Sequence, residues 1–251
     1  MPVSLLDRPT VYGARAKLGV IVPPTNTANE AEWNRAVPRG VSVHSTRMPL
    51  HTDTESDAGR AALRDDIRRF ARDLAQATVD VVAYGCTAGS MISPVTGLPD
   101  FMARETGCKA VTTAQAIVAA LTALDVRRLA IATPYHDALN DHEVAFLAEQ
   151  GFGTVAIAGL GYGGGGPAEY RNIARVPPED VFDLAKRVDR ADADALLVSC
   201  TDFATFDILQ RLEDDLGKPV VSSNQATLWY ALRTAGIDDR LPGLGRLCTQ
   251  H

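Results

Sequence analysis

Two cysteines, Cys86 and Cys200, occupy matching places in the chain, because each follows an apolar run and each precedes a threonine. A thiolate is a strong nucleophile and a thiol can give and recover a proton, so two thiols facing one substrate could perform covalent or proton-transfer chemistry. A cysteine at the end of an apolar strand can instead be a small packing group. We favour chemistry, since packing alone does not require the thiol twice.

Small and hydroxylated residues follow the first cysteine, and residues 87–90 can open a helix. Backbone N–H groups at a helix start would stabilise a thiolate at Cys86, lower its pKa and attract a substrate carboxylate. Thr87, Ser90 and Thr201 are the candidate hydroxyl donors to that carboxylate. Helix capping uses the same residue types, so this alternative stays open.

The other candidate metal and redox residues show no pattern. Cys108 and Cys248 have no counterpart and are interpreted as structural or incidental. There is no C-x-x-C or H-E-x-x-H, and the 5 histidines are scattered. We therefore expect free thiols rather than disulfides, and no metal site.

A glycine-rich segment at residues 159–167 formally contains G-x-G-x-x-G after a predicted strand. A dinucleotide site needs a helix that starts at these glycines, and consecutive glycines followed by Pro167 would not start one. We expect no organic cofactor. The segment is interpreted as a mobile loop over the substrate cleft, and Asn172, just after it, would reach the substrate when the loop closes.

The elements that must position these residues alternate between short β-branched runs and amphipathic stretches, the pattern of βαβ units in a parallel sheet. The clearest helix places Leu63, Ile67, Phe70 and Leu74 on one face. Strands are predicted at residues 18–22, 41–45, 79–84, 110–111, 128–132, 154–158, 195–199 and 220–222.

The chain also repeats itself. An offset of 110 positions aligns residues 18–24 with 128–134 and residues 107–116 with 217–226, while residues 79–87 resemble residues 193–201 at an offset of 114. A four-residue loop insertion explains the difference between the two offsets. We predict an α/β fold of two pseudo-symmetric open parallel-sheet lobes, one formed by residues 1–111 plus 224–251 and the other by residues 112–223. Such sheets bind ligands at the carboxyl ends of their strands, so the cleft between the lobes would have one cysteine on each wall.

The charge and hydrophobicity of the sequence limit the classes of binding partner that we expect. The formal net charge is −6, 46% of residues are hydrophobic, and no Lys/Arg cluster offers a surface for nucleic acid or an anionic membrane. No apolar run approaches the ~20 residues of a membrane span, and the first residues lack the apolar region of a signal peptide. We expect a cytoplasmic protein that binds neither nucleic acid nor membrane.

Five segments resemble the maleate cis-trans isomerase branch of the Asp/Glu racemase superfamily, which is related to arylmalonate decarboxylase. They are VIVPPTNTANEAE (20–32), YGCTAGS (84–90), ATPY (132–135), VSCTDF (198–203) and GKPVVSSNQATLW (217–229). The resemblance implies two α/β lobes, a small dicarboxylate substrate, no metal and no organic cofactor. It also implies that Cys86 is the nucleophile, Cys200 the second catalytic thiol, and Asn26, Tyr135 and Asn172 groups that hold the substrate carboxylates.

We therefore expect a cofactor-independent cis-trans isomerase of a small enedioate, of the maleate-to-fumarate type, working through a covalent adduct on Cys86 while Cys200 donates and recovers a proton. Four alternatives stay open: a two-thiol racemase, an arylmalonate-decarboxylase-like enzyme, an ectoine-utilisation enzyme and a non-catalytic small-acid binding protein. Racemases of the superfamily usually have Asn after the first cysteine, where this chain has Thr87, and arylmalonate decarboxylases have Gly in place of Cys86. Homodimer and homotetramer both stay open.

Overall fold

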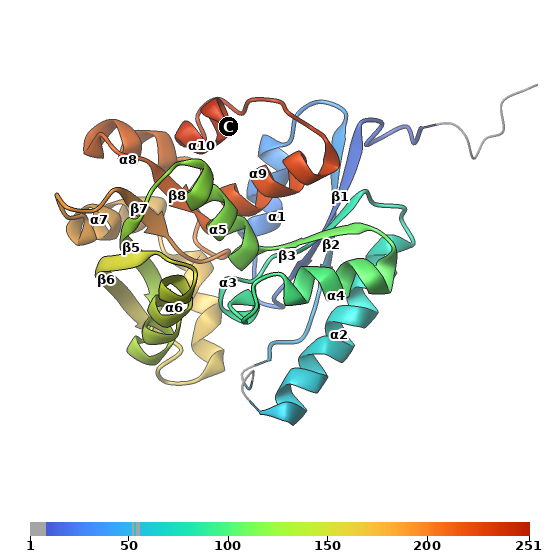
Figure 1. Cartoon of the computed structure of the whole chain (residues 1–251), viewed down its shortest axis with the longest axis horizontal. Helices are drawn as coiled ribbons and strands as arrows, with labels where there is room; N and C mark the ends of the chain where they lie inside the picture. Colours follow the sequence, from blue (N-terminus) through green and yellow to red (C-terminus); the bar gives the residue numbers. More distant parts are fainter. Residues whose placement is uncertain (1–8, 52, 54–55) are drawn as a thin grey trace, which may run out of the picture.

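The computed structural model describes residues 9–51, 53 and 56–251, which form two parallel four-stranded sheets flanked by helices (Figure 1). The first sheet has the order β2-β1-β3-β4 and the second the order β6-β5-β7-β8. The strands are β1 (Ala16–Val22), β2 (Val41–Arg47), β3 (Val81–Tyr84), β4 (Lys109–Thr112), β5 (Arg128–Tyr135), β6 (Gly153–Tyr162), β7 (Ala195–Val198) and β8 (Val220–Ser222). The predicted α/β class and the two parallel sheets are confirmed.

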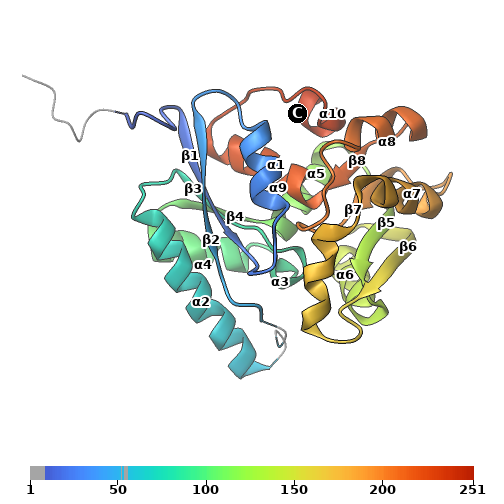
Figure 2. The ribbon, with the colours of Figure 1, turned by 180° about the vertical axis from the view of Figure 1, so that it is seen from behind.

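Helices cover both faces of the first sheet, with α2 and α4 on one face and α1 and α9 on the other (Figures 1 and 2). The predicted apolar face of α2 is buried at Leu63, Ile67 and Leu74, while Phe70 is partly buried. The helices are α1 (Asn29–Ala36), α2 (Asp57–Ala75), α3 (Thr87–Ser90), α4 (Gly97–Thr106), α5 (Thr113–Ala123), α6 (Asp137–Glu149), the 3₁₀ helix η2 (Pro167–Arg175), α7 (Pro178–Val188), α8 (Leu209–Leu216), α9 (Ser223–Ala235) and α10 (Gly245–Gln250).

The two sheets have the same strand order, as the sequence repeat predicts, but part of the predicted alignment is wrong. Gly85 N–H donates to Ile21 C=O and Ser199 N–H donates to Ala132 C=O, both at 2.8 Å. Ile21 is therefore the counterpart of Ala132, which makes the offset of β1 and β5 111 rather than 110. Strand pairing fixes this register, whereas short apolar runs resemble one another at neighbouring offsets.

The ends of the repeat keep the predicted offset of 110. Gly107 and Gly217 both end a helix with φ of +70°, a conformation that glycine adopts without steric cost. Thr112 and Ser222 both cap the following helix by accepting the N–H of the glutamine three residues on. The two lobes thus present the same strand ends to the cleft.

The helices that follow these caps, α5 and α9, pack against each other between the sheets, and α9 also contacts β1, β3 and β4 of the first sheet. The Thr227 hydroxyl donates to the Thr113 hydroxyl at 3.1 Å. One hydrophobic core runs through both sheets, from Val20 and Val81 to Leu197 and Val220. The lobe boundaries at residues 111/112 and 223/224 stay a prediction.

The glycine-rich segment differs from the predicted loop in its first half. β6 continues to Tyr162, because Gly159 still pairs with Thr133 and Tyr162 with Tyr135. Only residues 163–166 form a turn, and the Glu169 carboxylate accepts N–H groups from that turn at 2.9 and 3.0 Å. Glycine lacks a side chain but keeps its backbone hydrogen-bonding groups, so it does not end strand pairing here.

Candidate active site

Cys86 and Cys200 lie at equivalent strand ends, after β3 and β7, and both line one cavity of about 510 Å³. Parallel strands in each sheet end on the same side, which brings both thiols to the cavity from opposite lobes. Four of the predicted carboxylate-binding residues also line it: Asn26, Thr87, Tyr135 and Thr201.

The Cys86 thiol is half-buried and caps the single-turn helix α3, where its Sγ accepts the Gly89 N–H at 3.4 Å. Burial raises the pKa of Cys86, although the Gly89 N–H and the Tyr84 hydroxyl lower it in part. The expectation of a lowered pKa is therefore wrong. A four-residue helix supplies too few donors to offset the loss of water around the thiol.

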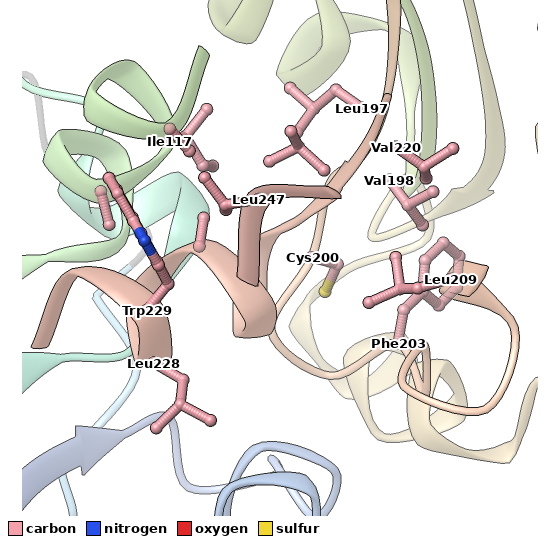
Figure 3. Close-up of a cluster of buried hydrophobic side chains, with 14 of the residues drawn as sticks. Ile117, Leu197, Val198, Cys200, Phe203, Leu209, Val220, Leu228, Trp229 and Leu247 are labelled. Carbon is pink, nitrogen blue, oxygen red and sulfur yellow. The ribbon is translucent and has the colours of Figure 1, made fainter. Parts of the chain in front are cut away.

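The Cys200 thiol is only 5% exposed and lies beside Phe203 and Leu209 at the edge of the core (Figure 3). Its Sγ accepts the Asp202 N–H at 3.3 Å, and the nearby Tyr135 hydroxyl partly lowers its pKa. Burial and the nearby Asp202 charge raise the pKa of Cys200 to about 12. Cys200 is a thiol at neutral pH, with a proton to donate.

The polar groups around the thiols connect the two lobes. Asn26 donates to the Thr201 hydroxyl at 3.1 Å, and that hydroxyl donates to Gly85 C=O at 3.1 Å. The Thr87 hydroxyl donates to Ser223 Oγ at 2.9 Å. Since each hydroxyl has one proton, Thr87 and Thr201 donate within the protein here, not into the cavity.

Two predicted site residues lie off the cavity wall. Ser90 is buried and donates to Cys86 C=O at 2.6 Å while accepting the Ala114 N–H, so it shapes the turn under the thiol. Asn172 is exposed on η2 and lines a separate hollow. Tyr170 and Ile173 of that helix face the cavity instead. The rotation of η2 about its own axis sets which of its residues face the cavity, and the sequence does not reveal that rotation.

Buried acids that the sequence analysis missed position the loops of the site. Asp202 accepts the N–H groups of Thr27 and Ala28 at 2.8 and 3.3 Å, which ties the β1–α1 loop to the Cys200 loop. Glu32 of α1 accepts the N–H groups of Thr205 and Phe206. Burial raises the pKa of Asp202 to about 6 and that of Glu32 to about 7.

The cavity wall is short of cations. Among the described residues that line it there is no lysine or arginine, but His51, His136 and His142 are present. His51 Nε2 lies 2.9 Å from an Asp66 carboxylate oxygen. Across the described part of the chain, no cluster of three or more His, Cys, Asp or Glu side chains is arranged to hold a metal ion. In the same part, no helix is long and apolar enough to cross a membrane.

Unequal thiol environments predict unequal alkylation. Cys108 is partly exposed and outside the cavity, Cys86 is half-buried with a raised pKa, and Cys200 and Cys248 are buried. At pH 7.5, iodoacetamide should label Cys108 at least threefold faster than Cys86 and should barely label the other two. Saturating succinate should protect Cys86 and leave Cys108 unchanged, as measured by peptide mass spectrometry. Equal protection of both would contradict the cavity assignment.

Comparison with known proteins agrees with this geometry. A family model described as arylmalonate decarboxylase matches residues 18–248. The chain is 30% identical to maleate isomerase of Nocardia farcinica, over 93% of this chain and 96% of that one. It is 33% identical to arylmalonate decarboxylase of Bordetella bronchiseptica, over 92% of this chain and 95% of that one.

Solved structures show the same relationship. A cysteine-to-serine mutant of N. farcinica maleate cis-trans isomerase with a covalently bound succinylcysteine intermediate has a TM-score of 0.83 at 28% identity, covering 94% of this chain and 99% of that one. An arylmalonate decarboxylase crystal structure has a TM-score of 0.78 at 32% identity, covering 92% and 98%. The family resemblance and the expectation of an isomerase are confirmed. The chain belongs to the arylmalonate decarboxylase family, together with the maleate isomerases that it resembles over nearly its whole length.

Proposed function

We propose that this protein is a cofactor-independent cis-trans isomerase that converts a small enedioate of the maleate type to its trans isomer. The observation that carries the proposal is the pair of unequal thiols in one cavity. Cys86 is half-buried beside the Gly89 N–H and the Tyr84 hydroxyl, whereas Cys200 is buried and protonated, with a pKa of about 12. One thiol suits nucleophilic attack and the other suits proton donation.

The proposed reaction starts when the Cys86 thiolate adds to one alkene carbon. The alkene electron pair moves to the neighbouring carbon, which takes the proton of the Cys200 thiol, and a succinyl thioether forms on Cys86. Rotation about the new single bond brings the carboxylates to opposite sides. The Cys200 thiolate then removes the proton from that neighbouring carbon, the C–H electron pair re-forms the alkene, and the C–S bond breaks with its electrons on the Cys86 sulfur. The trans product leaves, with Cys86 again a thiolate and Cys200 again a thiol.

The surroundings of each thiol support these roles. The Gly89 N–H and the Tyr84 hydroxyl stabilise the small thiolate fraction at Cys86. The Asp202 N–H and the Tyr135 hydroxyl stabilise the thiolate that forms briefly at Cys200. A succinyl thioether is also the species named in the structure of the N. farcinica isomerase mutant.

We propose that neutral groups hold the two carboxylates, because no lysine or arginine occurs among the described lining residues. Asn26 and Tyr135 both line the cavity beside the thiols. Asn26 has a second amide proton for one carboxylate, and backbone N–H groups near the strand ends assist. The Tyr135 hydroxyl has a single proton, which serves the Cys200 sulfur, so Tyr135 would bind a carboxylate only if that proton turned away from Cys200. Asn172 would bind a carboxylate only if η2 rotated to bring this side chain from the separate hollow into the cavity. The oligomeric state, homodimer or homotetramer, stays a prediction.

Arylmalonate decarboxylation is the second candidate, favoured by 33% identity to the B. bronchiseptica enzyme. Proton NMR of the purified protein with maleate, maleamate, phenylmalonate and D- or L-aspartate separates the candidates. We expect conversion of maleate to fumarate without added cofactor. Phenylacetate would identify a decarboxylase, and solvent deuterium at the α-carbon of aspartate a racemase. Binding of maleate without any turnover would indicate a non-catalytic binding protein.

A further inference from the structure

A buried carboxyl group behind the second thiol has no role in the reaction as described so far. Glu143 of α6 is 1% exposed, and neither of its carboxyl oxygens reaches a hydrogen-bonding partner in the described structure. The Ser199 hydroxyl, fully buried, also lacks a partner there. Buried polar groups are nearly always satisfied, so two orphaned groups beside a reactive thiol call for an explanation.

The fold directs Glu143 toward Tyr135 and Ser199. Asn140, one helical turn earlier, accepts from the Thr133 hydroxyl at 2.6 Å and donates to Tyr135 C=O at 3.4 Å. This pins the face of α6 that carries Asn140 against the end of β5, and residues three apart share a helix face. The next strand, β7, pairs with β5 and ends where the Ser199 N–H donates to Ala132 C=O at 2.8 Å.

The electrostatic coupling follows the same path. Burial raises the pKa of Glu143 to about 7, and the Ser199 hydroxyl lowers it in part, although the two side chains stop short of hydrogen-bonding geometry. A charge on Glu143 contributes to the raised pKa of Tyr135. The Tyr135 hydroxyl in turn acts on the Cys200 sulfur and favours its thiolate form. The influence of Glu143 therefore reaches Cys200, the proton donor of the reaction, through one intervening side chain, Tyr135.

Few other charges lie near this carboxyl group. β6, which packs on α6, has Tyr162 as its one titratable residue, and β5 has Tyr135 at the near end and Arg128 at the far end. The segment after β7 adds Cys200 and Asp202. α6 itself adds Asp137, Asp141, His142 and Glu149, and the His142 ring bonds to Met91 C=O rather than to Glu143. Since no lysine or arginine of these segments pairs with Glu143, an ionised Glu143 would place an uncompensated charge near the Tyr135 hydroxyl.

We propose that Glu143 is a positioning residue for Cys200, whose transient thiolate forms only while the Glu143 carboxyl is protonated. This inference rests on the proposed function, in which Cys200 gives its proton to a substrate carbon and later recovers one. Glu143 exchanges no proton with the substrate. When it is neutral, Glu143 leaves the Tyr135 hydroxyl free to face the Cys200 thiolate. When it is ionised, its negative charge acts on the Tyr135 hydroxyl, which then stabilises a thiolate at Cys200 less well.

The test is the pH profile of kcat/KM for maleate in the wild type and in Glu143→Gln, which keeps the shape and cannot ionise. As pH rises through about 7, the Glu143 carboxyl of the wild type loses its proton, and the active fraction falls about tenfold per pH unit beyond that point. The ratio of variant to wild-type kcat/KM should therefore be flat below pH 6 and rise at least tenfold by pH 8.5. A ratio independent of pH would overturn the proposal.

The ratio also separates Glu143 from Glu32, which titrates in the same range, because only the Glu143 contribution disappears in the variant. Ser199→Ala provides a second variant should Glu143→Gln fail to fold. It removes the hydroxyl that lowers the pKa of Glu143, so the alkaline fall in activity should move to higher pH. An unmoved alkaline fall in folded Ser199→Ala protein would overturn the proposal.

A readout without turnover distinguishes failure of this proposal from failure of the proposed function. Peptide mass spectrometry follows iodoacetamide labelling of Cys200 at pH 6 and pH 8.5. Glu143→Gln should label Cys200 at least threefold faster than the wild type at pH 8.5 and equally at pH 6, with Cys108 as internal standard. Equal rates at both pH values would overturn the role of Glu143 even if maleate is isomerised, and the predicted rates would support it even if maleate is not the substrate.

Discussion

Cys86→Ser is expected to abolish turnover, by about 10⁴-fold or more, and to form no adduct with maleate. A serine hydroxyl near its ordinary pKa is a poor nucleophile without an adjacent base. The groups nearest the Cys86 sulfur, the Gly89 N–H and the Tyr84 hydroxyl, are donors rather than bases. The structure therefore offers a serine at this place no means of activation.

Cys200→Ser is expected to fail at a different step. The Cys86 thiolate remains able to add to the alkene. A serine hydroxyl at position 200, however, is a much slower partner than the thiol in removing the proton from the neighbouring substrate carbon, so the adduct does not break down. An adduct heavier than the protein by one maleate should accumulate on Cys86. The N. farcinica isomerase mutant, with serine in place of a cysteine, contains a covalently bound succinylcysteine.

Intact-protein mass spectrometry of both variants after mixing with maleate decides between the two roles. Cys108→Ser is the matched control, because Cys108 lies outside the cavity and should leave turnover unchanged. An adduct on Cys200 in the Cys86→Ser protein would reverse the assignment. Full activity in either active-site variant would remove the two-thiol mechanism.

The positions of the two thiols were predictable because the same strand-Cys-Thr pattern occurs in both halves of the sequence repeat. Cys86 and Cys200 follow equivalent apolar strands, and parallel strands deliver their carboxyl ends to one edge of a sheet. The exact register of β1 and β5 was not predictable, since residues 18–24 match the second half almost as well at 110 as at 111 positions. Only the backbone bonds of Ile21 and Ala132 decide it.

The electrostatics of the site were the least predictable part. The small residues after Cys86 suggested a helix that lowers the thiol pKa, but the helix is a single turn and burial dominates. Glu32 and Glu143 look like solvent-facing helix residues in the sequence, but both are buried in the structure, Glu32 against the loop that contains Thr205 and Phe206. Burial of a carboxyl depends on residues far away in the chain, so local patterns carry no sign of it.

Tyr135→Phe is expected to lower kcat by about 10² to 10³-fold, the usual loss when one donor to a developing negative charge is removed. Tyr135 and Cys200 both line the cavity, and the Tyr135 hydroxyl favours the thiolate form of Cys200. Phenylalanine keeps the buried ring and takes away only that donor. KM should change less than fivefold, because the bond matters most while Cys200 is a thiolate.

Tyr84→Phe provides the informative contrast, since the Tyr84 hydroxyl favours the thiolate form of Cys86 instead. Loss of that donor should slow formation of the Cys86 adduct, whereas Tyr135→Phe should slow the proton transfers at Cys200 that complete and reverse it. Quench-flow with mass detection of the adduct separates the two, and Tyr162→Phe, outside the cavity wall, is the control. Equal slowing of adduct formation by both tyrosine variants, with adduct decay unchanged, would show that the two thiols do not have separate roles. A mechanism with Cys86 alone would then have to explain both the formation and the decay of the adduct.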